Sequence, residues 1–421
     1  MHRLLIKTIN NHYFGLFMAF LIMNLIFVGS SDVFAETRVI LGLERLVDEK
    51  IDLIKNKRIG IIANHTSVDS EGRSIVTVLS QHAKITALFG PEHGFTGDNS
   101  AGASIEQTDI KGIPIYSLYG NTRVPTHEML SNVDVLIYDM QDVGVKFYTY
   151  ISTMFLALGA AEREGIPIIV LDRPNPIGAV RVEGAITNPA YTSFVGVMPL
   201  PIRYGMTVGE LAKLMNQESY AGFSLNADLT VIPMKNYSRA MNYDQTGLPW
   251  IAPSPNMPSL DTAAIYPGFC LFEGTNLSEG RGTDDPFLIV GAPFINGRKW
   301  LAAVPEELLT GLTTEVIKFT PKSIPGKSEN PKYKGKACHG LHFTITDQDK
   351  IKPIELSVAL LCAAHSLYPE QYKSLRFMDR LWGDESLRTL IGEGKDFQFI
   401  MKTTNKGVKQ FLSVRDKYLL Y

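Results

Sequence analysis

Cysteine is scarce in this chain of 421 residues. The three cysteines, Cys270, Cys338 and Cys362, are odd in number and lie far apart. They cannot form a disulfide framework, and no Cys/His spacing resembles a zinc site. We therefore expect buried free thiols, a common environment for this side chain.

A strong net charge is also missing. The 41 Lys and Arg residues nearly balance the 43 Asp and Glu residues, which leaves a formal charge of −2. Non-specific binding of nucleic acid needs a basic field, so no nucleic-acid partner is expected. A hydrophobic content of 45% with 20% charged residues is typical of a well-packed globular chain.

Nucleotide-binding motifs are absent as well. No G-x-G-x-x-G follows the first predicted strand, where the chain reads Asn64-His65-Thr66-Ser67. A dinucleotide is not expected, because its pyrophosphate needs that close approach of the backbone. Gly326-Lys327-Ser328 resembles the end of a phosphate-binding loop, but Pro321 stands where the first glycine is required. We predict no cofactor.

One long apolar run is present, at the start of the chain. Phe14–Val28 follows Arg3 and Lys7, and Val33–Ala35 fits a small-x-small cleavage site. The run is shorter than the roughly 20 residues of a membrane span. We expect a signal peptide over residues 1–35, a periplasmic or secreted protein, and no stable membrane span after cleavage. An uncleaved anchor is the alternative.

Short apolar runs in the first half of the chain end in polar residues capable of chemistry. Such runs predict strands that are buried on both faces of a parallel sheet. The segments Arg73–His82 and Tyr148–Arg163 predict intervening helices. Open parallel sheets bind ligands beyond the carboxyl ends of their strands, so the polar clusters should line one crevice. The predicted strands are Arg58–Ala63, Ile85–Phe89, Val133–Tyr138 and Pro167–Leu171.

The pattern changes farther along the chain. A capping-box spacing at Thr207 and Glu210 predicts a helix over Thr207–Met215, and Leu229–Met234 predicts a strand. Residues 247–285 have little periodicity and predict a long functional loop. The C-terminal part predicts helices at Trp300–Leu312 and Ile354–Ser366 and strands at Thr314–Phe319 and Leu341–Thr346.

The fold class that follows is α/β. We predict a Rossmann-like parallel sheet domain over residues 36–289 and a smaller C-terminal α/β domain over residues 290–421.

The second strand ends in Gly90-Pro91-Glu92-His93-Gly94, which shapes the backbone to present a carboxylate. Partial desolvation beside Phe89 and Phe95 would raise the pKa of Glu92 and suit a general acid. The alternative is a turn with a solvated glutamate. His93 would orient Glu92 or a sugar hydroxyl, or make a structural hydrogen bond.

Two further clusters follow later strands. Asp139 and Asp142 would hold a metal, bind sugar hydroxyls, or cap the following helix. In Asp172–Pro176, two prolines fix the backbone and set Arg173 and Asn175 toward the crevice. An internal brace between Asp172 and Arg173 is the alternative.

The segment Phe272–Phe287 is rich in acids, hydroxyls and glycines around Arg281. Glycines let backbone amides approach a ligand, and arginine can pair bidentately with a carboxylate. The flanking phenylalanines return the segment to the core, which favours a ligand-binding loop over a solvated one.

These motifs together resemble the NamZ-type exo-β-N-acetylmuramidases, a YbbC-like bacterial family that was long uncharacterised. The resemblance covers nearly all of the chain after the apolar N-terminal run. It extends to Pro253–Ser259, Tyr333–Gly340 and Tyr418–Tyr421. The motifs that carry it are Ala63–Ser67, Phe89–Phe95, Tyr138–Tyr150, Leu171–Gly178 and Glu273–Phe287.

The resemblance implies a glycoside hydrolase that removes N-acetylmuramic acid (MurNAc) from the non-reducing end of peptidoglycan fragments. It also implies an active-site cleft between the Rossmann-like domain and the smaller C-terminal domain. The expected partners are peptidoglycan-derived MurNAc-GlcNAc saccharides, and export fits such a substrate. The family's presumed catalytic glutamate falls on Glu92. Glu273 is the first candidate for a second catalytic carboxylate, and Asp139 is the second, with at least one of them expected within about 10 Å of the Glu92 carboxyl. Otherwise the substrate's acetamido group would assist.

The substrate carries one lactyl carboxylate, which suits the planar fork of an arginine. Arg281 is the preferred partner, followed by Arg173. The full set of predicted substrate-binding residues is Asn64, His93, Asp139, Asp142, Arg173, Asn175, Asn276, Arg281 and Thr283.

Two other classes of protein fit the same residues. A metal-dependent cell-wall hydrolase would use His65, Glu92, His93, Asp139 and Asp142 as ligands, and a chelator would abolish its activity. A periplasmic sugar-binding protein would bind tightly without turnover.

Overall fold

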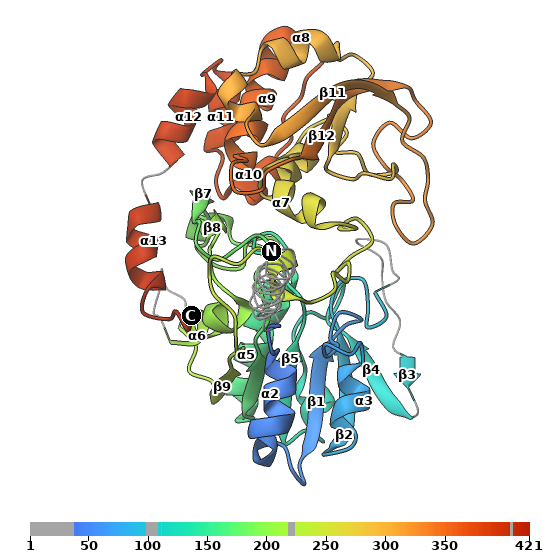
Figure 1. Cartoon of the computed structure of the whole chain (residues 1–421), viewed down its shortest axis with the longest axis vertical. Helices are drawn as coiled ribbons and strands as arrows, with labels where there is room; N and C mark the ends of the chain where they lie inside the picture. Colours follow the sequence, from blue (N-terminus) through green and yellow to red (C-terminus); the bar gives the residue numbers. More distant parts are fainter. Residues whose placement is uncertain (1–37, 98–107, 111, 218–223, 405–406) are drawn as a thin grey trace, which may run out of the picture. The chain divides into compact units, whose positions relative to one another are not determined.

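A parallel sheet forms the core of the first half of the chain in the computed structural model (Figure 1). The structure describes residues 38–97, 108–110, 112–217, 224–404 and 407–421. The predicted signal peptide lies outside the described residues and stays a prediction. Within the described ranges, no helix is both long enough and apolar enough to cross a membrane.

The sheet has seven strands in the order β3-β4-β2-β1-β5-β6-β9. All neighbouring strands are parallel except β3, which runs antiparallel to β4 at the edge. The strands predicted from the apolar runs are confirmed. The bounds are β1 Arg58–Ala63, β2 Lys84–Gly90, β3 Thr108–Ile110, β4 Ile113–Ser117, β5 Val135–Asp139, β6 Ile168–Leu171 and β9 Leu229–Ile232.

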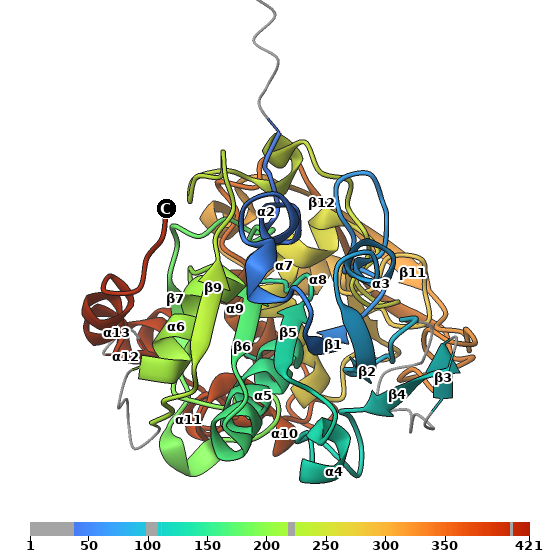
Figure 2. The ribbon, with the colours of Figure 1, turned by 90° about the horizontal axis from the view of Figure 1, so that it is seen from below.

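The sheet is buried on both faces, as predicted for apolar residues in succession. In β5, Val135 and Ile137 pack into one hydrophobic cluster, whereas Leu136 and Tyr138 pack into another. Figure 2 shows α2 and α5 on opposite sides of these strands. The helices of this part are α2 Gly42–Glu49, α3 Ile75–Leu79, α4 His127–Leu130, α5 Tyr150–Glu164 and α6 Val208–Gln217.

The C-terminal part contains a three-stranded antiparallel sheet in the order β10-β12-β11. This smaller mixed α/β unit confirms the predicted fold class, while the domain boundary near residue 290 stays a prediction. A small two-stranded sheet joins β7 Glu183–Ile186 to β8 Pro201–Arg203. The C-terminal elements are α7 Leu260–Phe269, β10 Ile289–Ala292, α8 Gly297–Ala302, β11 Leu312–Phe319, β12 Cys338–Ile345, α9 Pro353–Leu367, α10 Phe377–Trp382, α11 Ser386–Gly392, α12 Phe397–Thr404 and α13 Val408–Arg415.

Two predicted elements were wrong. The helix expected over Trp300–Leu312 ends at Ala302, and Pro305 follows, which cannot continue a helix. The loop expected over residues 247–285 contains α7. Every residue of α7 from Thr262 to Phe269 is buried, so the helix has no polar face and shows no amphipathic periodicity.

Two local predictions are confirmed. The Thr207 N–H donates to the Glu210 carboxylate at 3.0 Å, and the Glu210 N–H donates to Thr207 Oγ1 at 3.3 Å, which completes the capping box at α6. All three cysteines are free thiols, and Cys270 and Cys338 are buried as predicted, whereas Cys362 is partly exposed.

Candidate active site

A cavity of about 540 Å³ opens beyond the carboxyl ends of several sheet strands. Part of its lining follows β2, β4 and β5 in the chain, and the rest comes from the loops at residues 193–195 and 254–257, from α7, from α10 and from the Phe272–Phe287 segment. It therefore matches the cleft predicted between the sheet and the C-terminal part. Its lining includes Glu92, His93, Tyr119, Arg123, Tyr148, Thr149, Tyr150, Phe194, Tyr266, Glu273, Arg281, Phe287 and Arg380.

Glu92 is presented by a tight turn after β2. A Cβ atom at Gly90 would lie 2.8 Å from the Phe95 backbone nitrogen, so only glycine allows the turn to fold this closely. His93 and Gly94 follow with φ angles of 70° and 80°. A non-glycine residue in this region costs energy, and such strain often occurs at functional sites. His93 is buried and also lines the cavity.

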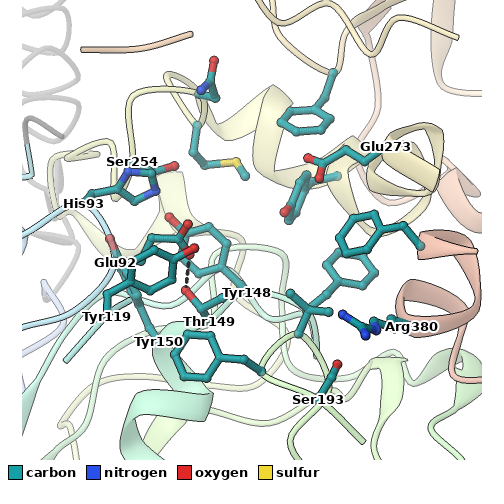
Figure 3. A pocket seen from close by; sticks show the side chains of 18 of the residues that line it. Glu92, His93, Tyr119, Tyr148, Thr149, Tyr150, Ser193, Ser254, Glu273 and Arg380 are labelled. Carbon is teal, nitrogen blue, oxygen red and sulfur yellow. Dashed lines mark hydrogen bonds between the residues drawn. The ribbon is translucent and has the colours of Figure 1, made fainter. Parts of the chain in front are cut away.

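Hydroxyl groups hold the Glu92 carboxylate in place. Thr149 Oγ1 donates to Glu92 Oε2 at 2.7 Å, as the dashed line in Figure 3 shows. The Tyr119 phenol also hydrogen-bonds to Glu92. Burial, together with the nearby Glu92 charge, raises the pKa of Tyr119. Tyr119 therefore stays neutral and keeps its proton for hydrogen bonding.

Aromatic rings connect the Glu92 side of the cavity to its other side. Tyr148 meets Tyr150 edge-on at 4.8 Å between ring centroids, and Tyr266 meets Phe287 in the same way at 4.7 Å. Tyr148 and Tyr266 link these two pairs at 6.2 Å. Edge-to-face contacts of this kind make a rigid wall from residues far apart in the sequence.

Glu273 lies across the cavity from Glu92 in the view of Figure 3. Arg281 Nη2 donates to Glu273 Oε1 at 2.7 Å, and the Arg281 guanidinium lies 5.1 Å from the Phe287 ring centroid. Arg281 Nε is 3.6 Å from Glu279 Oε1. Both Glu273 and Arg281 line the cavity, but each already has the other as a partner.

Other predicted residues of this loop brace the loop itself and lie outside the cavity lining. Asn276 Nδ2 donates to the Gln371 carbonyl at 2.8 Å, and Asn276 Oδ1 accepts from the Lys373 N–H at 2.8 Å. Thr283 Oγ1 donates to the Gly280 carbonyl at 2.6 Å. We leave Asn276 and Thr283 out of the proposed substrate contacts.

The charged residues predicted at the ends of β5 and β6, Asp139 and Arg173, are buried rather than exposed to the cavity. Asp139 is 0% exposed and Arg173 is 5% exposed. Arg173 Nη2 donates to Asp139 Oδ2 at 2.9 Å, and Arg173 Nε donates to the other carboxylate oxygen. Neither residue lines the cavity. The alternative of an internal brace between Asp172 and Arg173 is seen in the backbone, since the Arg173 N–H donates to Asp172 Oδ1 at 3.0 Å, whereas the Arg173 guanidinium pairs with Asp139.

Asp142, Asn175 and Asn64 are also occupied by internal hydrogen bonds. Asp142 accepts from the Gly144 N–H at 2.7 Å and from the Tyr204 hydroxyl, and burial raises the pKa of Asp142 to about 6. Asn175 Nδ2 donates to the Met206 carbonyl at 2.8 Å. Asn64 Oδ1 accepts from the Thr66 N–H at 2.9 Å.

This placement corrects the expectation that all the polar clusters line one crevice. Parallel strands bring the polar clusters to the same edge of the sheet. The clusters at the ends of β1, β5 and β6 are nevertheless buried by the residues packed around them and do not reach the cavity. Asn64, Asp139, Asp142, Arg173 and Asn175 stabilise the base of the site and are left out of the proposed substrate contacts.

The ligands required by the metal-dependent alternative do not converge in the described residues. His65 Nε2 lies 2.7 Å from the Ala252 carbonyl oxygen, and Asp139 is paired with Arg173. Within the described ranges, no three His, Cys, Asp or Glu side chains are grouped as a metal site.

Several cavity residues escaped the sequence analysis. Three of them, Tyr148, Thr149 and Tyr150, belong to the motif from which only Asp139 and Asp142 were predicted as site residues. The aromatic residues of that motif could have indicated a sugar-binding wall. Arg123 and Arg380 have no local signal, because they reach the cavity from segments more than 250 positions apart.

Lys146 joins the two parts of the cavity wall. Its ammonium group is buried and donates to the Ala185 carbonyl at 2.9 Å and to the Trp382 carbonyl at 2.6 Å. Trp382 ends α10, the helix that carries Arg380. Burial lowers the pKa of Lys146 to about 7, because the charged form loses its hydration.

This pKa predicts a pH-dependent stability. Between pH 7.5 and 9 the unfolded chain binds more protons at Lys146 than the folded chain, so the site makes the free energy of unfolding rise with pH. The contribution is at most about 1.4 kcal/mol per pH unit. Lys146→Met removes it, which urea unfolding of both proteins across this range would measure. Other titrating groups cancel, since both proteins carry them. Identical slopes would contradict the prediction.

A cavity at the carboxyl edge of the sheet, lined by two glutamates, three arginines and several aromatic rings, fits a glycoside hydrolase. The comparisons with known proteins assign the chain to that class. The chain belongs to the exo-β-N-acetylmuramidase NamZ family, whose N-terminal model matches residues 59–261 and whose C-terminal model matches residues 264–421. The resemblance seen in the motifs is confirmed.

Individual relatives support the same assignment. The chain is 44% identical over 386 residues to the peptidoglycan β-N-acetylmuramidase NamZ of Bacillus subtilis, covering 90% of this chain and 91% of the relative. Two solved DUF1343 family proteins of Bacteroides fragilis share the fold. They have TM-scores of 0.80 and 0.73 at 32% and 34% identity, and each match covers 91% of this chain and 99% of the other.

Proposed function

We propose that this protein is an exo-acting glycoside hydrolase that releases MurNAc from the non-reducing end of peptidoglycan fragments. The observation that carries the proposal is Glu92, a carboxylate held by Thr149 in a large cavity between the parallel sheet and the C-terminal part. The similarity to the Bacillus relative over most of both chains supports the substrate class.

Glu92 acts as the general acid and base in this mechanism. It protonates the glycosidic oxygen as the Glu273 carboxylate bonds to the anomeric carbon and the bond to the leaving sugar breaks. It later takes a proton from the water that attacks the same carbon and displaces Glu273. The bond from Thr149 fixes one carboxylate oxygen, so the orientation of the carboxyl group is set before the substrate binds.

The test is turnover of a chromogenic β-MurNAc glycoside beside the β-GlcNAc analogue, with the anomer of the first product identified by NMR. We expect hydrolysis of the MurNAc glycoside and a lower kcat/KM for the analogue. Tight binding of the MurNAc glycoside without turnover would instead support the sugar-binding alternative.

Glu273 is the proposed second catalytic carboxylate. Its loop brings it into the cavity, and its bond to Arg281 holds it there. Glu273→Gln is expected to lower kcat by about 10²-fold or more while the fold stays intact, because an amide cannot form the bond to the anomeric carbon that the carboxylate forms. The measurement is kcat on the β-MurNAc glycoside. Near-normal turnover would point to assistance by the acetamido group of the substrate.

We also propose that the protein is exported and works in the periplasm or outside the cell. The basic and apolar segments before Val33–Ala35 support a cleaved signal peptide, and a wall-derived substrate fits this location. N-terminal sequencing of the protein recovered from cells should begin at Glu36. An intact N-terminus would support a retained anchor.

A further inference from the structure

Two arginines line the cavity without an acidic partner. Arg123 lies between β4 and α4, and Arg380 lies on α10. Both side chains are exposed, and within the described part of the chain neither guanidinium takes part in a hydrogen bond or ion pair. An unneutralised cation that faces a ligand cavity is a natural site for an anionic group of that ligand.

The arginines named from the sequence are already neutralised. Arg281 pairs with Glu273 at 2.7 Å, and Arg173 pairs with Asp139 below the cavity. A substrate carboxylate at either position would have to displace an internal carboxylate. The same carboxylate meets no such competitor at Arg123 or Arg380.

The contacts of Arg123 with aromatic rings leave its charge available to a ligand. Its guanidinium carbon lies 4.5 Å from the Phe194 ring centroid and 6.0 Å from the Tyr119 ring centroid. A cation–π contact places the positive charge over the ring without pairing it with an anion. Tyr119 contacts both Arg123 and Glu92, so Arg123 lies near Glu92 while its charge is not neutralised by an ion pair.

Arg380 is placed firmly by its helix. The neighbouring Asp379 cannot neutralise it, because Asp379 accepts two hydrogen bonds from Arg388 at 2.7 and 2.9 Å. The end of α10 is fixed by the bond from Lys146 to the Trp382 carbonyl. Figure 3 shows the Arg380 guanidinium pointing into the cavity near Ser193.

We propose that Arg380 pairs with the lactyl carboxylate of MurNAc and so determines the preference for muramyl over glucosaminyl substrates. Arg123 adds a second positive charge that attracts the same group at longer range. This inference rests on the proposed function, and it replaces Arg281 and Arg173 as the residues that recognise the carboxylate.

The experiment measures kcat/KM for chromogenic glycosides of β-MurNAc, of β-GlcNAc and of MurNAc with its lactyl group converted to the amide. The amide keeps the size of the substituent and removes its charge. The proteins are the wild type, Arg380→Ala, Arg380→Lys, Arg123→Ala and the control Arg376→Ala. Arg376 is an exposed arginine that immediately precedes α10 and does not line the cavity.

Arg380→Ala is expected to lower the ratio of kcat/KM for MurNAc over GlcNAc by about 10- to 100-fold, the scale of a hydrogen bond to a charged group. Arg380→Lys should recover part of the ratio, and Arg123→Ala should have a smaller effect. Arg376→Ala should keep the wild-type ratio. The wild type should discriminate against the amide, and Arg380→Ala should not.

A wild-type ratio in Arg380→Ala, or a larger effect of Arg123→Ala, would overturn the assignment to Arg380. An equal loss on all three glycosides would also overturn it, because that pattern indicates a structural role. Failure of the wild type to hydrolyse the MurNAc glycoside would instead refute the proposed function, and the inference with it.

Discussion

Replacing Glu92 with glutamine is expected to lower kcat on a β-MurNAc glycoside by at least about 10²-fold. Glutamine has nearly the same shape and keeps an oxygen that can accept the bond from Thr149, so the turn after β2 should fold as before. The change removes only the ability to give and take a proton. Steady-state kinetics on the purified variant would measure the loss.

Glu128→Gln is a suitable control for this experiment. Glu128 is an exposed glutamate on α4 that does not line the cavity, so this variant should keep wild-type kinetics. Thermal unfolding of both variants would establish that they are folded. Near-normal turnover by Glu92→Gln would remove Glu92 from the mechanism.

The buried pair of Asp139 and Arg173 should dominate the stability of the site. Asp139→Asn would leave the Arg173 guanidinium buried without a counter-charge, since both side chains are shielded from water. Removing one partner of a buried ion pair typically costs about 3–5 kcal/mol. That is a large share of the roughly 5–15 kcal/mol that stabilises a native protein. Urea unfolding would measure the decrease in the free energy of unfolding.

Asp134→Asn provides a matched comparison. Asp134 pairs with Arg58 at 2.7 Å, but both side chains are well exposed, with 39% and 44% of their surface accessible. Solvent screens such a pair, so its loss should cost much less than the loss of Asp139. If both variants lost the same free energy of unfolding, burial would not make the Asp139–Arg173 pair more stabilising than an exposed pair.

The sequence by itself determined the features that depend on neighbouring residues. Apolar residues in succession specify strands such as β5 because each of its two faces meets a separate hydrophobic cluster. Thr207 and Glu210 close a capping box only three positions apart. The Glu92 turn is likewise encoded by its own glycines, which permit a backbone conformation that other residues avoid.

Only the tertiary structure decided which polar side chains face the substrate. Asp139 and Arg173 lie at strand ends, as Glu92 does. They are 34 positions apart in the chain, and folding brings them together and buries them. Arg123, Phe194 and Arg380 show no common pattern in the sequence, and folding alone places them around one cavity. Exposure and charge pairing are properties of the packed chain, because they depend on neighbours that are distant along the sequence.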